Sequence, residues 1–552
     1  MGSTGSTGRP VRMTRASAVR GTVATLGLLA TMTLMGCPGK GAVHPSGSDD
    51  ARSPQGGSAS APASTASTGG AAAAEPAPVP AAAPATVPAV RQYDRRDGPG
   101  WRPARGARVV ADPDGPAADE ARLLAGDLGL PFDRGPARAG DVELVPRVGQ
   151  AGGPEAYELT TEGRKVTITS AGDAGLFYGT RTVVQAVRTG GGLPEGVIKD
   201  APDRPQRGLN LDIARKHFPA DWIEARLREM ADLKLNQLGL HFSDDQGFRI
   251  ESSSHPEIVS QQHLTKAEVR RIVQLAGSLH ITVVPEIDSP GHLGAVIAAH
   301  PGLQLRDATG AVARGAVDIS NPESARIVDD LLREYAPLFP GRWFHLGADE
   351  YRALMARDPQ TSYPGLADAA RRKYGPRAKV QDLATGWLND RAAVVRSLGR
   401  TPKAWNDGFF PDGVVVPDKS IEVEYWTGKE NGARNPQDYL NEGRTLVNLN
   451  DEFLYYVLGE PNDFRYPTGE RIYGGWGPAV LRGTAAASAA GPDRVLGGRL
   501  AVWCDRAGAQ TPEQVAAGIH VPLAAVAQRV WDPRPPTRPW PDFRSLAGRV
   551  RR

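Results

Sequence analysis

The sequence predicts an α/β protein in which a (β/α)8 TIM barrel follows a small α+β domain. The first observation is that eight strand-like segments, most of them separated by helical patterns, occur in residues 204–552. The second is that residues 93–203 contain alternating apolar and polar side chains, the period of half-buried strands. With 552 residues, of which 40% are hydrophobic, the chain is long and apolar enough for both cores.

Residues 1–37 have the features of a signal peptide. Arginines precede an apolar run, residues 22–35, that is too short to span a bilayer as an ordinary transmembrane helix. The run closes in a Leu-Met-Gly-Cys motif, ending at Cys37, that resembles a bacterial lipobox. We therefore expect lipidation of Cys37 and export, as a cell-surface lipoprotein anchored to the membrane or in secreted form. An ordinary signal peptide with an incidental cysteine is the alternative.

Residues 38–92 consist mainly of Ala, Ser, Pro, Gly and Thr, with few large apolar side chains. Such a composition cannot bury enough apolar surface to offset the entropy cost of folding. We therefore expect a disordered linker that is semi-extended because of its prolines.

The small domain is expected at residues 93–203. Segments 157–161 and 165–169 alternate as strands do, whereas residues 118–128 and 174–187 have helical patterns. This domain carries no catalytic group of residues by itself.

The barrel is expected at residues 204–552. Thr265 and Glu268 form a capping box, and Asn321 followed by Pro322 marks another helix start. A doubly wound open sheet is the structural alternative, although no glycine-rich nucleotide fingerprint follows the first strand. The expected strands are residues 208–213, 237–242, 281–287, 342–346, 402–406, 421–426, 444–450 and 499–503.

The formal charge of +3 gives no indication of a nucleic-acid partner. The four arginines that precede Cys37 belong to the predicted signal peptide, so the remaining chain is close to neutral and has no basic run. Only Cys37 and Cys504 occur, which excludes a disulfide framework.

The predicted carboxyl ends of the strands, where TIM barrels hold their catalytic groups, are rich in carboxylates and aromatic rings. A lone carboxylate is most often a helix cap or a solvated loop residue, and a tryptophan can simply cap the barrel core. Recurrence around the whole barrel favours a sugar site, because flat rings suit sugar C–H faces and charged groups bind hydroxyls. These residues are Arg207, Asp212, Arg215, Asp244, Asp245, Glu286, Asp288, His292, Asp349, Glu350, Trp405, Asp407, Trp426, Asp451, Tyr455, Trp503 and Asp505.

Metal ligation is another possible use of such groups. The first strand has no His-x-His pair, and the chain has no Cys/His cluster with zinc spacing. We therefore predict no metal and no other cofactor, and expect the histidines to be structural or to support neighbouring groups. The possible ligands considered are His241, Asp244, Asp245, His292 and His345.

Four motifs, in the expected order, resemble those of family 20 glycoside hydrolases. The small domain, with Ala-Gly-Leu-Phe-Tyr-Gly at 174–179, is also similar to the one that precedes the barrel in that family. The resemblance covers the chain from about Tyr93 onward. The motifs are Arg-Gly-Leu-Asn-Leu-Asp at 207–212, His-Phe-Ser-Asp-Asp-Gln-Gly at 241–247, Pro-Glu-Ile-Asp-Ser-Pro-Gly-His at 285–292 and His-Leu-Gly-Ala-Asp-Glu at 345–350.

The resemblance implies an exo-acting, retaining β-N-acetylhexosaminidase that removes terminal β-linked GlcNAc or GalNAc through an oxazolinium intermediate. Glu350 would protonate the leaving oxygen and later activate water, and Asp349 would orient the acetamide N–H. Neighbouring side chains leave a strand in opposite directions, so Asp349 and Glu350 should not flank the scissile bond as acid and nucleophile.

The resemblance also assigns supporting roles by position. Arg207 would bind hydroxyls of the terminal sugar, and Asp244 and His292 would form a relay behind Glu350, with Asp288 beside them. Asp505 stands where the family often has glutamate, and the acetamide-binding tyrosine maps either to Phe453 or to Tyr455. The tryptophans expected around the sugar are Trp405, Trp426 and Trp503, with Trp476 at the entrance.

Two other functions fit the same residues. One is a lipid-anchored sugar-binding protein of the same fold with weak or lost catalysis, against which the presence of Glu350 argues. The other is a chitinase-like endo-enzyme, but the Asp-x-x-Asp-x-Asp-x-Glu run of such enzymes is absent. The expected partner is an oligosaccharide or polysaccharide with a terminal N-acetylhexosamine.

Overall fold

The computed structural model describes residues 82–149, 152–429, 433–459 and 467–551. The predicted signal peptide, the lipidation of Cys37 and most of the predicted linker lie outside these residues. No helix in this described part is both long enough and apolar enough to cross a lipid bilayer.

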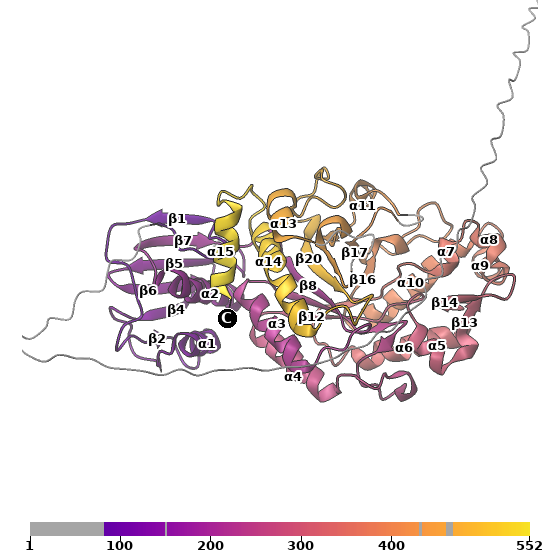
Figure 1. The fold of residues 1–552 in the computed structure, drawn as a ribbon, viewed down its shortest axis with the longest axis horizontal. Coiled ribbons are helices and arrows are strands. Elements are labelled where there is room, and N and C mark those ends of the chain that lie inside the picture. Colours follow the sequence, from indigo (N-terminus) through magenta and orange to yellow (C-terminus); the bar gives the residue numbers. More distant parts are fainter. Residues whose placement is uncertain (1–81, 150–151, 430–432, 460–466, 552) are drawn as a thin grey trace, which may run out of the picture. The chain divides into compact units, whose positions relative to one another are not determined.

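The small domain is a mixed sheet covered by two helices, and the strand and helix patterns predicted for it are present. Its strands, within the described ranges, are β1 (Gln92–Arg95), β2 (Val109–Val110), β3 (Phe132–Asp133), β4 (Val142–Pro146), β5 (Tyr157–Glu162), β6 (Lys165–Ser170) and β7 (Gly196–Asp200), in the order β1-β7-β5-β6-β4-β2-β3. The helices are α1 (Ala118–Leu128) and α2 (Asp173–Gly190). Figure 1 shows both helices on the same side of this sheet.

The linker prediction is wrong for its last residues, because residues 82–92 already belong to the folded domain. Val87 is fully buried and its N–H donates to Oε1 of Gln185 over 2.7 Å. The N–H of Ala89 donates to Oε1 of Gln528 over 2.8 Å. Composition alone pointed to disorder, whereas these distant side chains supply the backbone partners that composition does not reveal.

The second domain is a closed parallel barrel, which confirms the predicted fold. The first barrel strand pairs with the second from Gly208 opposite Gln237 to Asp212 opposite His241. The last strand pairs both with the first and with the seventh, so the sheet closes and the open doubly wound alternative is wrong. In the described residues the barrel strands are β8 (Gln206–Asp212), β9 (Gln237–His241), β12 (Thr282–Glu286), β15 (Trp343–His345), β16 (Thr401–Trp405), β17 (Glu422–Tyr425), β18 (Leu446–Asn448) and β20 (Val495–Trp503).

Helices separate most of the barrel strands, and the predicted start signals are in place. Thr265 and Glu268 form the capping box of α4 (Lys266–Ser278), and Asn321 caps α6 (Pro322–Tyr335). The other long helices are α3 (Ala220–Asp232), α9 (Pro364–Tyr374), α10 (Val380–Ser397), α14 (Pro512–Trp531) and α15 (Trp540–Val550). Shorter helices are α5 (Gly294–Ala299), α7 (Arg352–Met355), α8 (Pro359–Ser362), α11 (Pro436–Asn441), α12 (Asp451–Leu454) and α13 (Gly469–Gly475). The remaining elements are β10 (Ser243–Asp244), β11 (Gly247–Phe248), β13 (Gln304–Arg306), β14 (Val312–Val317), β19 (Tyr455–Val457) and the 3-10 helices η1 (Pro256–Ile258), η2 (Pro301–Leu303) and η3 (Asn406–Gly408).

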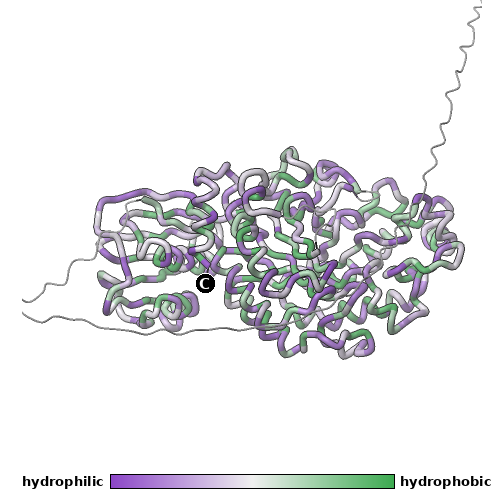
Figure 2. Tube along the Cα trace, viewed as in Figure 1, coloured by the Kyte–Doolittle hydropathy of each residue, from purple (hydrophilic) through white to green (hydrophobic). Residues whose placement is uncertain are grey.

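One large apolar core includes buried side chains of both domains, and a separate smaller cluster of aromatic residues lies at the carboxyl ends of the barrel strands. Figure 2 shows apolar segments in green running along the small-domain sheet and through the barrel. The aromatic cluster is where the candidate site lies.

Candidate active site

Asp349 and Glu350 lie in the loop after β15, and the backbone of this loop is not extended. Gly347, Ala348 and Glu350 have φ angles of 69°, 78° and 45°. Only glycine fits at 347, because a Cβ there would lie 1.6 Å from Oδ1 of Asp288. A left-handed conformation costs about 1–3 kcal/mol at each non-glycine residue, and it is kept only where the surrounding structure holds the backbone in place.

Two carboxylates hold the strained loop in place. The N–H of Ala348 donates to Oδ1 of Asp288 over 3.1 Å, and the N–H of Glu350 donates to Oδ2 of Asp407 over 3.0 Å. The loop therefore presents the Asp349-Glu350 pair in one fixed arrangement.

The prediction that these neighbouring side chains point in opposite directions is wrong. Nε2 of His292 lies 3.7 Å from Oδ2 of Asp349 and 3.4 Å from Oε2 of Glu350. The strand rule does not apply, because β15 ends at His345 and the left-handed residues of the loop turn both side chains toward one imidazole.

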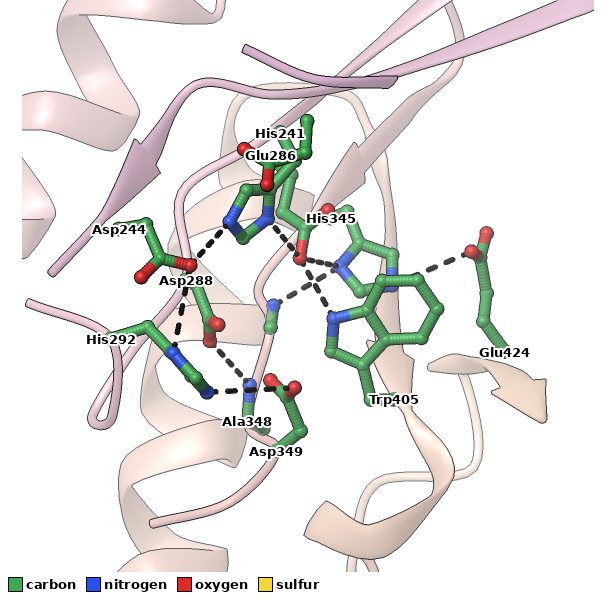
Figure 3. Close-up of polar contacts among 12 residues, drawn as sticks. His241, Asp244, Glu286, Asp288, His292, His345, Ala348, Asp349, Trp405 and Glu424 are labelled. Atoms are coloured by element: carbon green, nitrogen blue, oxygen red, sulfur yellow. Dashed lines mark hydrogen bonds and ion pairs between the residues drawn. The ribbon is translucent and has the colours of Figure 1, made fainter. Parts of the chain in front are cut away.

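Asp244 and His292 were predicted to form a relay behind Glu350, and Figure 3 shows these two side chains joined, with Asp349 on the other side of the imidazole. Nδ1 of His292 is 3.6 Å from Oδ2 of Asp244. The same carboxylate oxygen is 2.8 Å from Nε2 of His241 and 2.8 Å from the guanidinium of Arg215. The structure thus brings Asp244, His292, Asp349 and Glu350 together, as the sequence predicted.

The charges of the relay follow from its contacts. The carboxylates of Asp244, Asp349 and Asp288 raise the pKa of His292 well above its usual value, overcoming the burial that alone would lower it. The hydrogen bond from His292 is the main cause of a lowered pKa at Glu350. At neutral pH the free protein therefore holds an imidazolium beside a Glu350 carboxylate.

Asp349 itself and two acids beside it, Asp288 and Asp407, have pKa values above the usual range. Burial is the main cause of the raised pKa of Asp288, and the neighbouring Asp349 adds to it. Burial likewise raises the pKa of Asp349, and with the charge of Asp349 it raises the pKa of Asp407 to about 8. Asp288, His292 and Asp349 have possible ligand atoms close enough together to hold a cation. Their perturbed pKa values favour proton transfer among these groups instead.

The aromatic cluster beside the acids has four members. The rings of Trp426 and Tyr455 are stacked, with centroids 5.6 Å apart and an interplanar angle of 3°. Trp503 packs edge-on against Trp405 at 5.9 Å and lies 5.7 Å from Tyr455. Nε1 of Trp426 also donates to Oδ1 of Asp407 over 2.9 Å, which ties the rings to the catalytic loop.

A buried polar chain supports this cluster from inside the barrel; the sequence indicated Glu286, His241 and His345, but not Glu424 and Arg499. Oε1 of Glu286 accepts a 2.8 Å hydrogen bond from Trp405 and lies within 3.4 Å of both His241 and His345. Glu424 continues the chain toward Arg499. His241, Glu286 and His345 lie opposite one another in the barrel sheet, each as the last residue of its strand, so their place at the predicted strand ends was the available signal.

Two family models match the chain. The description "Glycosyl hydrolase family 20, catalytic domain" covers residues 205–534, and "Glycosyl hydrolase family 20, domain 2" covers residues 83–201. The chain belongs to glycosyl hydrolase family 20. The matched ranges coincide closely with the barrel and the small domain.

Two relatives are similar over much of this chain. Lacto-N-biosidase from Bifidobacterium bifidum is 30% identical over 459 residues, which cover 81% of this chain and 40% of that protein. Beta-hexosaminidase from Vibrio furnissii is 28% identical over 338 residues, which cover 53% of this chain and 52% of that protein. The chain therefore spans only about half the length, or less, of these relatives.

Solved family 20 structures share the fold. A mutant beta-hexosaminidase from Streptomyces plicatus in complex with the product GlcNAc is 25% identical, with a TM-score of 0.67 over 87% of this chain and 95% of that chain. The beta-N-acetylhexosaminidase from Streptomyces coelicolor is 25% identical, with a TM-score of 0.68 over 86% of this chain and 96% of that chain.

Arg207 does not lie at the family 20 site, contrary to the prediction. It is fully buried at the amino end of β8, where its guanidinium binds the Glu155 carboxylate at 2.7 Å and the hydroxyl of Tyr178 at 2.9 Å. The residue at the carboxyl end of the same strand is Arg215, which contacts Asp212, Asp244 and the face of Trp503. The prediction used the arginine that begins the motif, whereas the barrel places Arg215, three residues beyond the motif, at the site.

We expect Arg207→Met to destabilise the protein by about 3 kcal/mol, because it leaves Glu155 without its cation. Its KM should stay near that of the unmodified protein. Arg215→Met should instead raise KM by about 10–100-fold through loss of charged hydrogen bonds. Urea unfolding and steady-state kinetics on both variants check this, and a raised KM in Arg207→Met alone would restore the original assignment.

The structure also places Trp476, Tyr455, Phe453 and Asp505. Trp476 is fully buried after α13, where its ring fills the space above Gly498, so the prediction that it lines the entrance is wrong. Tyr455 lies in the aromatic cluster, whereas Phe453 packs in the main core under Arg471. Asp505 follows β20 and contributes to the electrostatic surroundings of Arg215.

Proposed function

We propose that this family 20 protein is an exo-acting, retaining β-N-acetylhexosaminidase that removes terminal β-linked GlcNAc or GalNAc. The observation that carries the proposal is the position of Asp349 and Glu350, whose carboxylates both reach Nε2 of His292. The four-membered aromatic cluster beside them supplies the flat apolar faces that a sugar ring needs.

In the first step the carbonyl oxygen of the substrate's own 2-acetamido group bonds to the anomeric carbon. The glycosidic C–O bond breaks, and the leaving oxygen takes a proton from Glu350. That proton comes from the His292 imidazolium, 3.4 Å from Oε2 of Glu350 in the free protein. The resulting oxazolinium N–H carries positive charge, which the carboxylate of Asp349 stabilises.

In the second step water replaces the oxazolinium oxygen at the anomeric carbon. Glu350, now a carboxylate, takes a proton from that water as its oxygen bonds to carbon. The oxazolinium ring opens and restores the acetamide, and the two displacements together retain the β configuration.

Paired substrates test the proposal. The β-N-acetylglucosaminide of a chromogenic alcohol should be cleaved, whereas the matching β-glucoside should be nearly inert because it lacks the internal nucleophile. Comparable rates on both substrates would overturn the mechanism, and no turnover of either would favour the sugar-binding alternative.

The raised pKa of His292 predicts the alkaline limit of activity. A raised pKa means that the proton needed by Glu350 stays in the site as pH rises through the usual histidine range. In His292→Gln that proton must reside on Glu350 alone, so the alkaline limb of kcat/KM should move to lower pH by at least about one unit. An unchanged limb in the pH profile would remove His292 from the relay.

Release of a disaccharide is a second candidate function. Asp505 is one methylene shorter than the glutamate frequent at this position in the family, and it contributes to the electrostatic surroundings of Arg215. The likeness to lacto-N-biosidase supports the same candidate. Chromogenic glycosides of GlcNAc and of a disaccharide with GlcNAc at its reducing end distinguish the two, since faster turnover of the disaccharide would support the second.

We also propose that the protein is exported with a lipid on Cys37, on the basis of the lipobox-like motif. Mass spectrometry of the mature N-terminus should find a diacylated Cys37. An intact or differently cleaved leader without lipid would overturn the anchor.

A further inference from the structure

We propose that His255, Glu257 and His300 form a binding site for a divalent transition-metal ion, chemically best suited to Zn²⁺, outside the candidate active site. The two histidines precede the 3-10 helices η1 and η2, in the loops after β11 and α5. Sequence spacing could not reveal the site, because these residues are far apart in the chain.

The three side chains already converge on one point. Oε1 of Glu257 lies 3.0 Å from Nδ1 of His255 and 2.9 Å from Nε2 of His300, and the three possible ligand atoms all lie within 4.8 Å of one another. Ligand atoms around tetrahedral zinc are ~3.4 Å apart, given bond lengths of about 2.0–2.2 Å. Small side-chain rotations would therefore admit the ion.

A carboxylate on the far side of the buried His255 provides the second observation. The side chain of His255 is only 6% exposed, and its Nε2 lies 3.5 Å from Oδ2 of Asp330 without a hydrogen bond in the described residues. A neutral His255 that donates from Nδ1 to Glu257 would turn the lone pair of Nε2 toward this carboxylate. With a metal on Nδ1, the proton moves to Nε2 and faces Asp330, as in carboxylate–histidine–zinc triads.

The surroundings leave an open coordination position. Glu257 and His300 keep 42% and 28% of their side-chain exposure, so an ion and a water ligand can enter. Asp330 and Glu323 lie beside the site, with Arg326 bound to both. Nitrogen and carboxylate ligands together suit zinc better than calcium or magnesium, which prefer oxygen alone.

The same residues suggest what the ion does. His292 lies two residues before α5, and His300 follows that helix directly. An ion held by His255 and His300 would link η1 to this helix and so restrain the segment that carries His292 into the relay. Figure 1 shows α5 next to α6, the helix that carries Asp330.

Calorimetric titration of the chelator-treated full-length protein with Zn²⁺ tests the site. The unmodified protein should bind one more equivalent than His300→Gln, which removes a ligand at a partly exposed position. Asp330→Asn should keep the site but weaken it by about 10–100-fold. His263→Gln, which changes a partly exposed histidine whose Nδ1 hydrogen-bonds to the Ser260 carbonyl, is the matched control and should bind as the unmodified protein does.

Diffraction at the zinc absorption edge from zinc-soaked crystals should locate the ion between His255 and His300. This measurement separates the proposed site from Asp288, His292 and Asp349, which also bring ligand atoms together. The proposal is wrong if His300→Gln retains the full stoichiometry and affinity, or if the anomalous signal lies only at the active-site acids.

Discussion

Glu350→Gln should lower kcat on a disaccharide with a poor leaving group by about 10²–10⁴-fold, the usual contribution of a general acid. The amide keeps the shape of the side chain, and the N–H of residue 350 still donates to Asp407, so the loop should remain in place. Substrates with an activated phenol as leaving group should be affected much less in the first step, because departure then needs little protonation. Steady-state kinetics on both substrate types measures the difference.

A matched control for this variant is Glu513→Gln, at the exposed start of α14. It removes one negative charge at an exposed helix start, outside the loop that carries Asp349 and Glu350, so its kcat should equal that of the unmodified protein. Near-normal turnover of the disaccharide by Glu350→Gln would remove Glu350 from the acid role, while equal losses on both substrate types would place its effect outside leaving-group protonation.

The barrel could be predicted because its local signals agree with the fold. Strand-like segments are separated by helical patterns along most of the chain, and the capping residues Thr265 and Asn321 mark helix starts where the structure has them. Closure was not visible in the same way, because it depends on the pairing of β20 with β8 and β18, which are far apart in sequence. The ordered residues before β1 were missed for a related reason, since Gln185 and Gln528 bind that segment from distant helices.

The sequence predicted the positions of site residues that follow a strand, but not that of the residue that lies near the start of one. Asp244, His292, Asp349 and Glu350 all follow the carboxyl ends of strands, and the structure brings them together. Arg207 was misplaced because it opens its strand, and a strand has its two ends on opposite faces of the barrel. The side-chain directions of Asp349 and Glu350 were misjudged because left-handed backbone at Ala348 and Glu350 cannot be read from residue types.

Asp349→Ala should reduce kcat/KM on β-N-acetylglucosaminides by about 10²–10³-fold, the cost of removing one preorganised group that stabilises developing charge. Asp349→Asn should lose a similar factor, because its neutral amide cannot balance the oxazolinium charge and can turn its own N–H toward it. Both variants should remain folded. Burial raises the pKa of Asp349, so its ionised form costs free energy in the native state, and its removal should not lower the thermal unfolding midpoint.

A thiazoline analogue of the oxazolinium intermediate separates this role from a general loss of substrate binding. The unmodified protein should bind the analogue much more tightly than either Asp349 variant does, whereas the product GlcNAc, which lacks the developed charge, should lose far less affinity. Inhibition constants for the two compounds measure the contrast. Equal losses for analogue and product would mean that Asp349 only shapes the ground-state site, and isolation of a covalent glycosyl ester on any barrel carboxylate would show that the enzyme, and not the acetamide, supplies the nucleophile.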